Sequence, residues 1–358
     1  MDEFVVDSHS EFLPSTSTST NNNNGTSDST AGVNAGAFGQ RYLRDESAVF
    51  THNAWDDVDW PEEETRRAVA VVEAQKAAAT ARLDDGAAPV EKWDDFYAAH
   101  TNRFFMDRKW VSREFPEIFQ RLNEGKMITI LDVGCGVGNT TFPLLNAIDD
   151  GECADRVFLH SCDFSATAIQ TLRANAGYDP SRCNAFVWDV VSTRLPSDAD
   201  DAMSDNIGAA KGSTHNSDRS AASSSTPSLR VGRPSAGSVD FILCIYVLSA
   251  LRPETHACAM RNLSALLAPG GIVFIKDYAR YDLTQLRFKP QRLIAEHFYA
   301  RGDGTLVYFF DADELHALLA NVGLTRLQNY VDKRLIVNRA KQLKMYRRWI
   351  QCKYAKPL

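Results

Sequence analysis

The stretch ILDVGCGVGN at 130–139 decides the fold of this chain. An apolar run ends at Asp132, and Gly134, Gly136 and Gly138 follow before a helical pattern begins. Glycine lets the backbone turn sharply and approach a ligand that a Cβ would displace. The N–H groups at the start of the next helix can bind a carboxylate. The stretch therefore predicts a strand, a ligand-binding loop and a helix.

Short apolar runs and helical patterns alternate on both sides of this loop. The runs predict strands at 128–133, 156–162, 185–189, 239–245, 271–277, 324–337 and 343–354. The helical patterns lie at 138–148, 165–176, 254–268 and 311–322. Short apolar strands separated by helices indicate a parallel sheet that is covered on both faces. We therefore expect an α/β, Rossmann-like fold with a mostly parallel seven-stranded sheet.

Composition divides the chain into three parts. Residues 1–37 are mostly polar and of low complexity, which predicts a disordered leader. Residues 38–125 are expected to form a helical extension that serves as a lid. Residues 126–358 form the Rossmann-like domain, with a low-complexity insertion at 197–237 that has little to bury.

Features of the whole chain exclude several classes of protein. No run approaches the roughly 18 apolar residues that a membrane helix needs. The first residues, MDEFVVDSHSEFLP, are typical neither of a secretory signal nor of a mitochondrial presequence. The seven cysteines are scattered without a C-x-x-C pair, which favours reduced thiols over a structural metal site. We expect a cytoplasmic or nuclear protein that binds neither membrane nor metal.

The charge is distributed unevenly along the chain. Residues 1–99 hold 19 acids and 7 bases, and the remainder holds 27 acids and 32 bases. The run from Lys333 to Lys353 contains eight bases and no acid. A local basic field suits phosphate binding, although a solvated face would produce the same pattern.

Two further acids, Asp163 and Asp189, follow the next two predicted strands. Asp163 can accept from both ribose hydroxyls, and Asp189 from an adenine amino group, at the edge where the glycine loop lies. The alternatives are an NAD-type domain or acids that only cap helices. The G-x-G-x-G spacing differs from the dinucleotide pattern G-x-G-x-x-G, so we interpret the crevice as a site for S-adenosylmethionine.

The extension should contain one helix from Pro61 to about Leu83 and a second that carries Trp93, Phe96 and Tyr97 on one face. Aromatic residues at this spacing favour simple packing. The functional alternative is a lid whose aromatic faces meet the sulfonium of the cofactor.

Several long strings resemble the tRNA N3-methylcytidine methyltransferases, a branch of the methyltransferase-like proteins. The strings include FGQRYLRDESAVFTHNAWDDVDW (38–60), WDDFYAAHTNRFFMDRKWVSREFPEIF (93–119), ILDVGCGVGNTTFPLL (130–145), LAPGGIVFIKDYARYDLTQLRFK (267–289) and VDKRLIVNRAKQLKMYRRWIQCKY (331–354). The likeness covers nearly all of the chain outside 1–37 and 197–237.

The resemblance implies cofactor contacts at Trp93, Tyr97, Gly134, Asp163, Asp189 and Ile245. It also implies methylation of cytidine 32 in the tRNA anticodon loop. The block at 38–60 resembles members that act on threonine and arginine tRNAs. The insertion and the leader depart from the family, and the leader, which lacks a basic tract, disfavours the mitochondrial members. They leave open the choice of tRNA and the need for an aminoacyl-tRNA synthetase or accessory protein.

Methylation of cytosine N3 needs no prior deprotonation, because N3 has a free lone pair at neutral pH. The enzyme must instead align N3 with the methyl group of the cofactor and tolerate the cation that methylation creates. The segment KDYARYD leaves the fifth predicted strand at the carboxyl edge. We expect Asp277 or Asp282 to stabilise the cation and Tyr278 or Tyr281 to stack the base. The alternative is a structural turn that closes the pocket.

Basic residues outside this segment are candidates for contacts with tRNA phosphate or ribose. His100 ranks below the arginines, since a lone histidine is more often a core residue. The candidate arginines are Arg103, Arg108, Arg280, Arg301, Arg334, Arg339, Arg347 and Arg348.

Two other functions remain open from the residues alone. The first is a methyltransferase that acts on protein or a small molecule, which the basic run disfavours. The second is a binding subunit that keeps the fold but has lost the cofactor, which the intact glycine loop disfavours.

Overall fold

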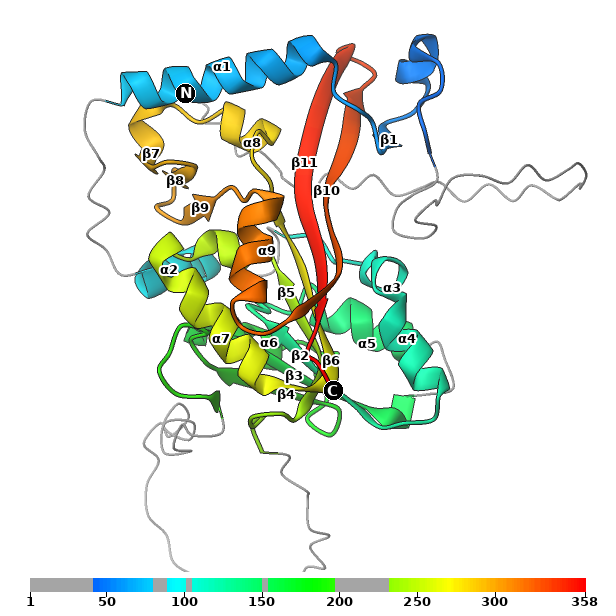
Figure 1. The fold of residues 1–358 in the computed structure, drawn as a ribbon. Coiled ribbons are helices and arrows are strands. Elements are labelled where there is room, and N and C mark those ends of the chain that lie inside the picture. The colour runs from blue at the N-terminus through cyan, green and yellow to red at the C-terminus, as the bar shows by residue number, and fades with distance from the viewer. Residues whose placement is uncertain (1–40, 80–88, 101–104, 150–153, 197–231) are drawn as a thin grey trace, which may run out of the picture.

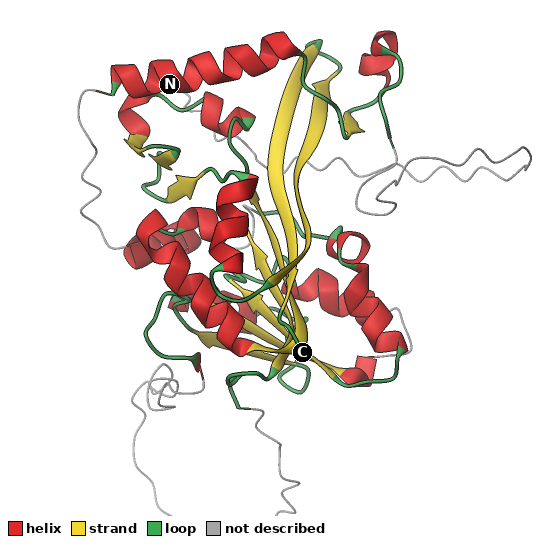
Figure 2. Cartoon of the chain, viewed as in Figure 1, coloured by secondary structure: helices red, strands yellow, loops and turns green. Residues whose placement is uncertain are grey.

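The computed structural model describes residues 41–79, 89–100, 105–149, 154–196 and 232–358. The expected leader at 1–37 lies outside these ranges, as does most of the expected insertion at 197–237. The described residues form a central sheet with helices on both of its faces (Figure 1). Figure 2 shows the long C-terminal strands extending from this sheet toward the N-terminal helix.

Within the described residues the central sheet has eight strands, in the order β1-β10-β11-β6-β5-β2-β3-β4. The parallel strands are β2 (Ile128–Val133), β3 (Val157–Asp163), β4 (Cys183–Val187), β5 (Val239–Ile245) and β6 (Leu267–Tyr278). Strands β10 (Thr325–Asn338) and β11 (Leu343–Ala355) form an antiparallel hairpin beside β6. These seven strands confirm the prediction, and the three-residue β1 (Ala54–Asp56), paired with β10, is an addition to it.

The strand β5 shows why the sheet needs cover on both faces. Phe241 and Leu243 pack in one buried cluster, and Ile242 and Cys244, which point to the opposite face, pack in another. Successive side chains of a strand alternate between faces, so a run without polar residues must be buried on both sides.

Helices from different parts of the chain supply this cover (Figure 1). One face is covered by α3 (Val111–Glu114), α4 (Pro116–Asn123) and α5 (Thr141–Asp149), and the other by α7 (His256–Leu266) and α9 (Ala312–Ala320). Helix α6 (Ala166–Arg173) packs against β4. The short 3-10 helices are η1 (Glu46–Thr51), η2 (Ala154–Arg156), η5 (Leu248–Ala250), η6 (Pro253–Thr255) and η7 (Pro290–Arg292).

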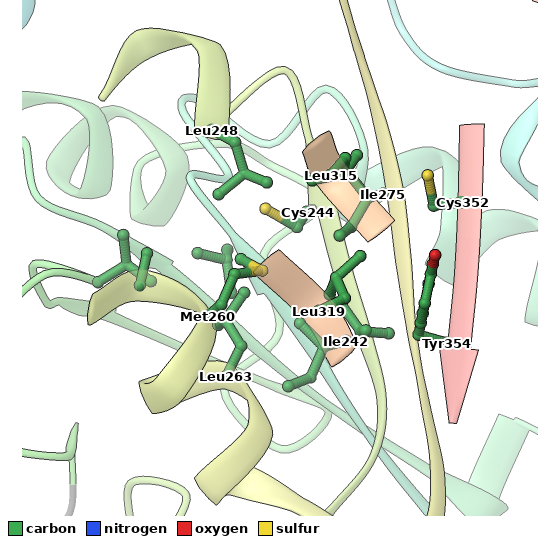
Figure 3. Packing of buried hydrophobic residues seen from close by; sticks show 14 of the residues in the cluster. Ile242, Cys244, Leu248, Met260, Leu263, Ile275, Leu315, Leu319, Cys352 and Tyr354 are labelled. Atoms are coloured by element: carbon green, nitrogen blue, oxygen red, sulfur yellow. The ribbon is translucent and has the colours of Figure 1, made fainter. Parts of the chain in front are cut away.

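The larger buried cluster joins α7 and α9 to the sheet (Figure 3). Met260 and Leu263 of α7 and Leu315 and Leu319 of α9 are fully buried against Ile242 of β5. Burying a side chain of this size stabilises the fold by about 1.5–3 kcal/mol. This packing holds the strand ends, and so the loops that follow them, in fixed positions.

The first long helix of the N-terminal extension lies over a second, smaller sheet (Figure 1). Helix α1 (Glu62–Ala78) begins after Pro61, as predicted, and Gln75 on its buried side donates hydrogen bonds to the carbonyl oxygens of Gln285 and Phe288. Below it lie α8 (Leu283–Leu286) and the strands β7 (Leu293–Ala295), β8 (Phe298–Ala300) and β9 (Leu306–Tyr308). Helix α2 (Pro89–His100) carries the predicted aromatic face.

Membrane-spanning helices and clusters of metal-binding side chains are absent from the described residues. No helix among them is long and apolar enough to span a membrane. No group of three or more His, Cys, Asp or Glu side chains in these ranges could hold a metal ion.

Candidate active site

The glycine loop after β2 is shaped by three left-handed residues. Gly134, Gly136 and Gly138 have φ angles of +60°, +54° and +98°. A Cβ at Gly136 would lie 2.6 Å from the hydroxyl oxygen of Tyr97, and one at Gly134 would lie 2.5 Å from a methyl carbon of Val247. Both the backbone conformation and the space therefore require glycine at these positions.

The carboxylate of Asp163 closes one side of the loop. Its Oδ2 accepts the Gly136 N–H at 2.9 Å, and its Oδ1 accepts the Ser165 N–H at 2.9 Å. Burial raises the pKa of Asp163 to about 6, although these two backbone donors oppose the shift. Each carboxylate oxygen has a second lone pair, so both can also accept a ribose hydroxyl.

Asp189 and Ile245 lie at the same edge of the sheet. Asp189 follows β4 by two residues and accepts the Val191 N–H at 3.0 Å, while its side chain stays half-buried. Ile245 is the last residue of β5 and is buried. Their predicted contacts with adenosine remain predictions.

Helix α2 lies on the glycine loop. Phe96 and Tyr97 are buried in one cluster with Val137 of the loop, and Trp93 packs beside them. The carboxylate of Asp94 accepts a hydrogen bond from the Ser165 hydroxyl, which ties α2 to the start of α6. The aromatic face thus packs and also covers the loop, as the predicted lid requires.

Arg108, predicted as an RNA contact, lies beside the cofactor loop. Its Nη1 donates to the Thr140 hydroxyl at 2.6 Å, and its backbone N–H donates to the Asn139 carbonyl at 2.8 Å. Its guanidinium carbon lies 5.6 Å from the centre of the Tyr246 ring. Arg108 also works against the burial that raises the pKa of Asp132 to about 7.

The two carboxylates that were predicted to stabilise the cationic cytosine both accept hydrogen bonds from nearby backbone N–H groups. Asp277 is fully buried and accepts the N–H groups of Ser249 and Tyr278, and burial raises its pKa to about 6. Asp282 is also fully buried, caps α8 and binds Arg347 at 2.9 Å. Because these contacts fit the structural alternative, a catalytic role for either residue remains a prediction.

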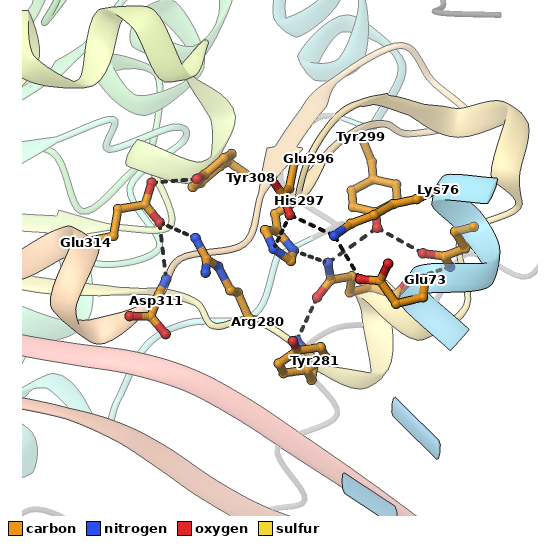
Figure 4. A network of polar contacts seen from close by, with 12 residues as sticks. Glu73, Lys76, Arg280, Tyr281, Glu296, His297, Tyr299, Tyr308, Asp311 and Glu314 are labelled. Carbon is orange, nitrogen blue, oxygen red and sulfur yellow. Dashed lines mark hydrogen bonds and ion pairs between the residues drawn. The ribbon is translucent and has the colours of Figure 1, made fainter. Parts of the chain in front are cut away.

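The two predicted stacking tyrosines differ in their surroundings. Tyr278 is buried, and its ring centre lies 5.3 Å from that of Tyr246. Tyr281 is half-buried with a left-handed φ of +68°, and its N–H donates to Gln285 Oε1 at 2.6 Å. Gln285 is in turn bonded to Tyr299, whose hydroxyl donates to Gln75 of α1 (Figure 4). The extension therefore supports the conformation of Tyr281.

Tyr246 is a residue at this edge that sequence analysis missed. It follows β5 directly, is half-buried and has a left-handed φ of +59°. The string CIYVLSA carries no glycine or asparagine that would signal such a conformation.

The eight bases between Lys333 and Lys353 do not form one open field. Five of them pair with acids: Lys333 with Asp59, Arg334 with Glu114, Lys344 with Glu46, Arg347 with Asp282, and Lys353 with Glu117. Four of these acids belong to the N-terminal extension. The guanidinium groups of Arg334 and Arg347 are bound to buried carboxylates, so both residues have internal partners, and their phosphate contacts remain predictions.

The other predicted RNA contacts are placed as follows. Arg280 pairs with Glu314 at 2.9 Å (Figure 4), and Arg301 donates to the Leu306 carbonyl. Arg348 lies between the rings of Trp60 and Tyr281, and Arg339 is exposed near the hairpin turn. Arg103 and the side chain of His100 lie outside the described residues.

The residues present fit S-adenosylmethionine. The glycines let the side chains of Tyr97 and Val247 approach the loop backbone, Asp163 offers carboxylate lone pairs at its side, and aromatic rings cover it. These features match a small nucleoside with a sulfonium centre.

Comparisons with known proteins agree with this geometry. A family model described as a methyltransferase domain matches residues 100–329. The tRNA N(3)-cytidine methyltransferase METTL2 of Danio rerio is 41% identical over 354 residues, covering 90% of this chain and 89% of that protein. METTL2B of Homo sapiens is 36% identical over 393 residues, covering 90% and 94%. The tRNA N(3)-methylcytidine methyltransferase trm140 of Schizosaccharomyces pombe is 37% identical over 332 residues, covering 92% and 94%.

Proposed function

Because this chain belongs to the tRNA N(3)-cytidine methyltransferases, we propose that the base it methylates is cytidine 32 of the anticodon loop. The chain is an S-adenosylmethionine-dependent enzyme that methylates N3 of cytidine in tRNA. Position 32 rests on the resemblance of its long sequence strings to the family. A base in a loop can be turned outward into a site, whereas N3 in a duplex is hidden.

One observation carries the assignment of the cofactor site: the aromatic face of α2 lies on the glycine loop, whose Gly136 N–H is held by Asp163. When bound there, S-adenosylmethionine supplies a methyl group on a positively charged sulfur. Asp163 would hold the ribose hydroxyls, and Asp189 the adenine amino group. Trp93 and Tyr97 would cover the sulfonium and exclude water.

The chain needs no general base for this transfer, because N3 is already unprotonated at neutral pH. Its remaining task is to hold N3 in line with the methyl carbon and to tolerate the cationic product. Asp277 lies at the correct edge for the second task, and the half-buried Tyr281 is the more accessible of the two predicted stacking residues. We expect Asp277→Asn and Tyr281→Ala to lower methylation while cofactor binding persists.

The substrates are proposed to be threonine and arginine tRNAs. The support is the block at 38–60, whose described part forms η1 and β1 and pairs with the hairpin. An aminoacyl-tRNA synthetase or an accessory tRNA-binding protein would add recognition of the rest of the tRNA. The cytoplasm is the proposed location.

The direct test uses tRNA transcripts that differ only at position 32. Wild-type protein should form 3-methylcytidine in a transcript with cytidine 32 and none in the matched transcript with uridine 32, as measured by nucleoside mass spectrometry. Asp163→Asn should reduce both cofactor affinity and product. Methylation of another cytidine would contradict position 32, and label transfer to protein instead of tRNA would contradict the substrate class.

A further inference from the structure

Tyr246 lies at the point of the sheet where ligands of this fold class are expected. Strand β2 pairs in parallel with β3 on one side and with β5 on the other, so the order in which successive strands join the sheet reverses at β2. Ligands of open α/β sheets bind at such a switch point, beyond the carboxyl ends of the strands. The glycine loop follows β2, and Tyr246 follows β5.

The residue after Tyr246 contacts the cofactor loop directly. A methyl carbon of Val247 occupies the space next to Gly134, only 2.5 Å from where a Cβ would lie. Tyr246 is therefore one residue away from the wall of the cofactor site. The backbone is fixed there, because the Tyr246 N–H donates to the Lys276 carbonyl of β6 at 2.8 Å.

The backbone of Tyr246 is in a conformation that a bulky residue rarely adopts. Its φ of +59° places it in the left-handed region, which is unfavourable for aromatic side chains. Such conformations persist only where the surrounding structure imposes them, and they gather at functional sites. The alternative, a residue needed only for a turn, would favour glycine or asparagine here.

The ring of Tyr246 lies between a residue beside the cofactor loop and the aromatic residues that surround Tyr278. On the cofactor side it meets the guanidinium of Arg108 at 5.6 Å. On the other side its ring centre lies 5.3 Å from that of Tyr278, which packs against Phe309. The side chain is only half-buried, in contrast to Tyr278.

We propose that Tyr246 is a substrate-positioning residue whose ring forms the wall of the target-base site next to the methyl donor. The proposal rests on the proposed function, since it concerns where the cytosine lies during methylation. A flat aromatic wall restricts the base to an orientation that presents N3, and an aromatic ring also tolerates the positive charge that methylation creates. The left-handed backbone would hold the ring between Arg108 and Tyr278.

Two substitutions separate the ring from the backbone. Tyr246→Asn keeps a residue that tolerates the left-handed conformation but removes the ring, and Tyr246→Phe keeps the ring. For the Asn variant, kcat with tRNA should fall about 100-fold, the size of effect expected from a misplaced substrate, while KM for tRNA changes little. The Phe variant should retain most of the activity.

The control is Tyr178→Phe, which alters a tyrosine before the amino end of β4, away from this edge. It should leave kcat unchanged. Cofactor affinity, by calorimetry, and thermal unfolding should be close to wild type for all three variants.

Full activity in Tyr246→Asn would overturn the inference, as would a loss of cofactor affinity that accounts for the whole loss of rate. Wild-type protein that binds cofactor but methylates no tRNA would overturn the proposed function instead.

Discussion

The glycine loop and the C-terminal hairpin were both predicted to bind ligands, but they are constructed in opposite ways. The loop gathers its functional groups from neighbouring strand ends, and its Gly136 N–H is bound by the carboxylate of Asp163. The hairpin carries eight bases between Lys333 and Lys353, of which five are paired with acids from elsewhere in the chain.

The difference shows that charge near a site has two uses. The acidic extension neutralises much of the basic hairpin, so attraction between the two segments helps to hold the extension on the catalytic domain. Only the unpaired part of the hairpin is left for an external anion.

Removing the charge of Glu114 should destabilise the protein most. Glu114 is buried, and it binds Lys276 at 2.7 Å and Arg334 at 3.1 Å. Loss of one member of a buried ion cluster costs about 3 kcal/mol, so Glu114→Gln should lower the free energy of unfolding by about this amount in denaturant titration. The control, Glu62→Gln, breaks an exposed pair with Arg66 and should cost less than about 0.5 kcal/mol. Equal effects would show that the cluster does not stabilise the fold.

Adding one methyl group to the glycine loop should weaken cofactor binding strongly. In Gly136→Ala the new Cβ displaces the Tyr97 hydroxyl, and we expect cofactor affinity to fall about 100-fold, as for other loops that need close backbone approach. Gly323→Ala is the matched control, because Gly323 has a similar φ of +78° and nothing within 4 Å of the added Cβ. Because Gly323 follows α9 and is not part of the cofactor loop, Gly323→Ala should leave cofactor affinity at the wild-type value in calorimetry.

Cofactor affinity should depend on pH through Asp163. Its pKa of about 6 is raised by burial, so lowering the pH from 7 to 5 protonates the free carboxylate and removes an acceptor for the ribose hydroxyls. Because binding favours the ionised form, affinity should fall about tenfold over this range. Asp163→Asn should bind weakly with a flatter pH profile. If the variant keeps the wild-type slope, another group is responsible.

The smallest effect should come from the exposed bases near the hairpin turn. Arg339→Ala with Lys341→Ala should weaken tRNA binding several-fold for all sequences alike and reduce the slope of log K against log salt by about 2. The control Arg326→Ala removes an exposed charge at the opposite end of β10 and should change the slope less. Filter binding at several salt concentrations measures both.

Sequence analysis succeeded where function depends on chain order. Strand β2, the glycine loop and Asp163 could be predicted from the apolar runs and from the glycine and acidic residues that end them. Parallel strands bring their carboxyl ends to one edge of the sheet, so these residues meet there. The partners of Arg334 and Arg347 could not be foreseen, since Glu114 and Asp282 lie 220 and 65 residues away.

Short elements were missed for a different reason. Strand β1 and strands β7 to β9 have three residues each, too few for a period to show. The left-handed Tyr246 was also invisible, because its conformation is imposed by neighbours and not by its own preference.

The position of β1 has a consequence for solubility. Trp55 and its two neighbours pair with Arg334, Leu335 and Ile336 of β10, which would otherwise be the outermost strand of a long sheet. An edge strand with unpaired backbone N–H and C=O groups can pair with a strand of another molecule. Strand β1 therefore covers part of this edge, and we expect a protein shortened past Asp56 to expose unpaired backbone groups of β10 to other copies of itself.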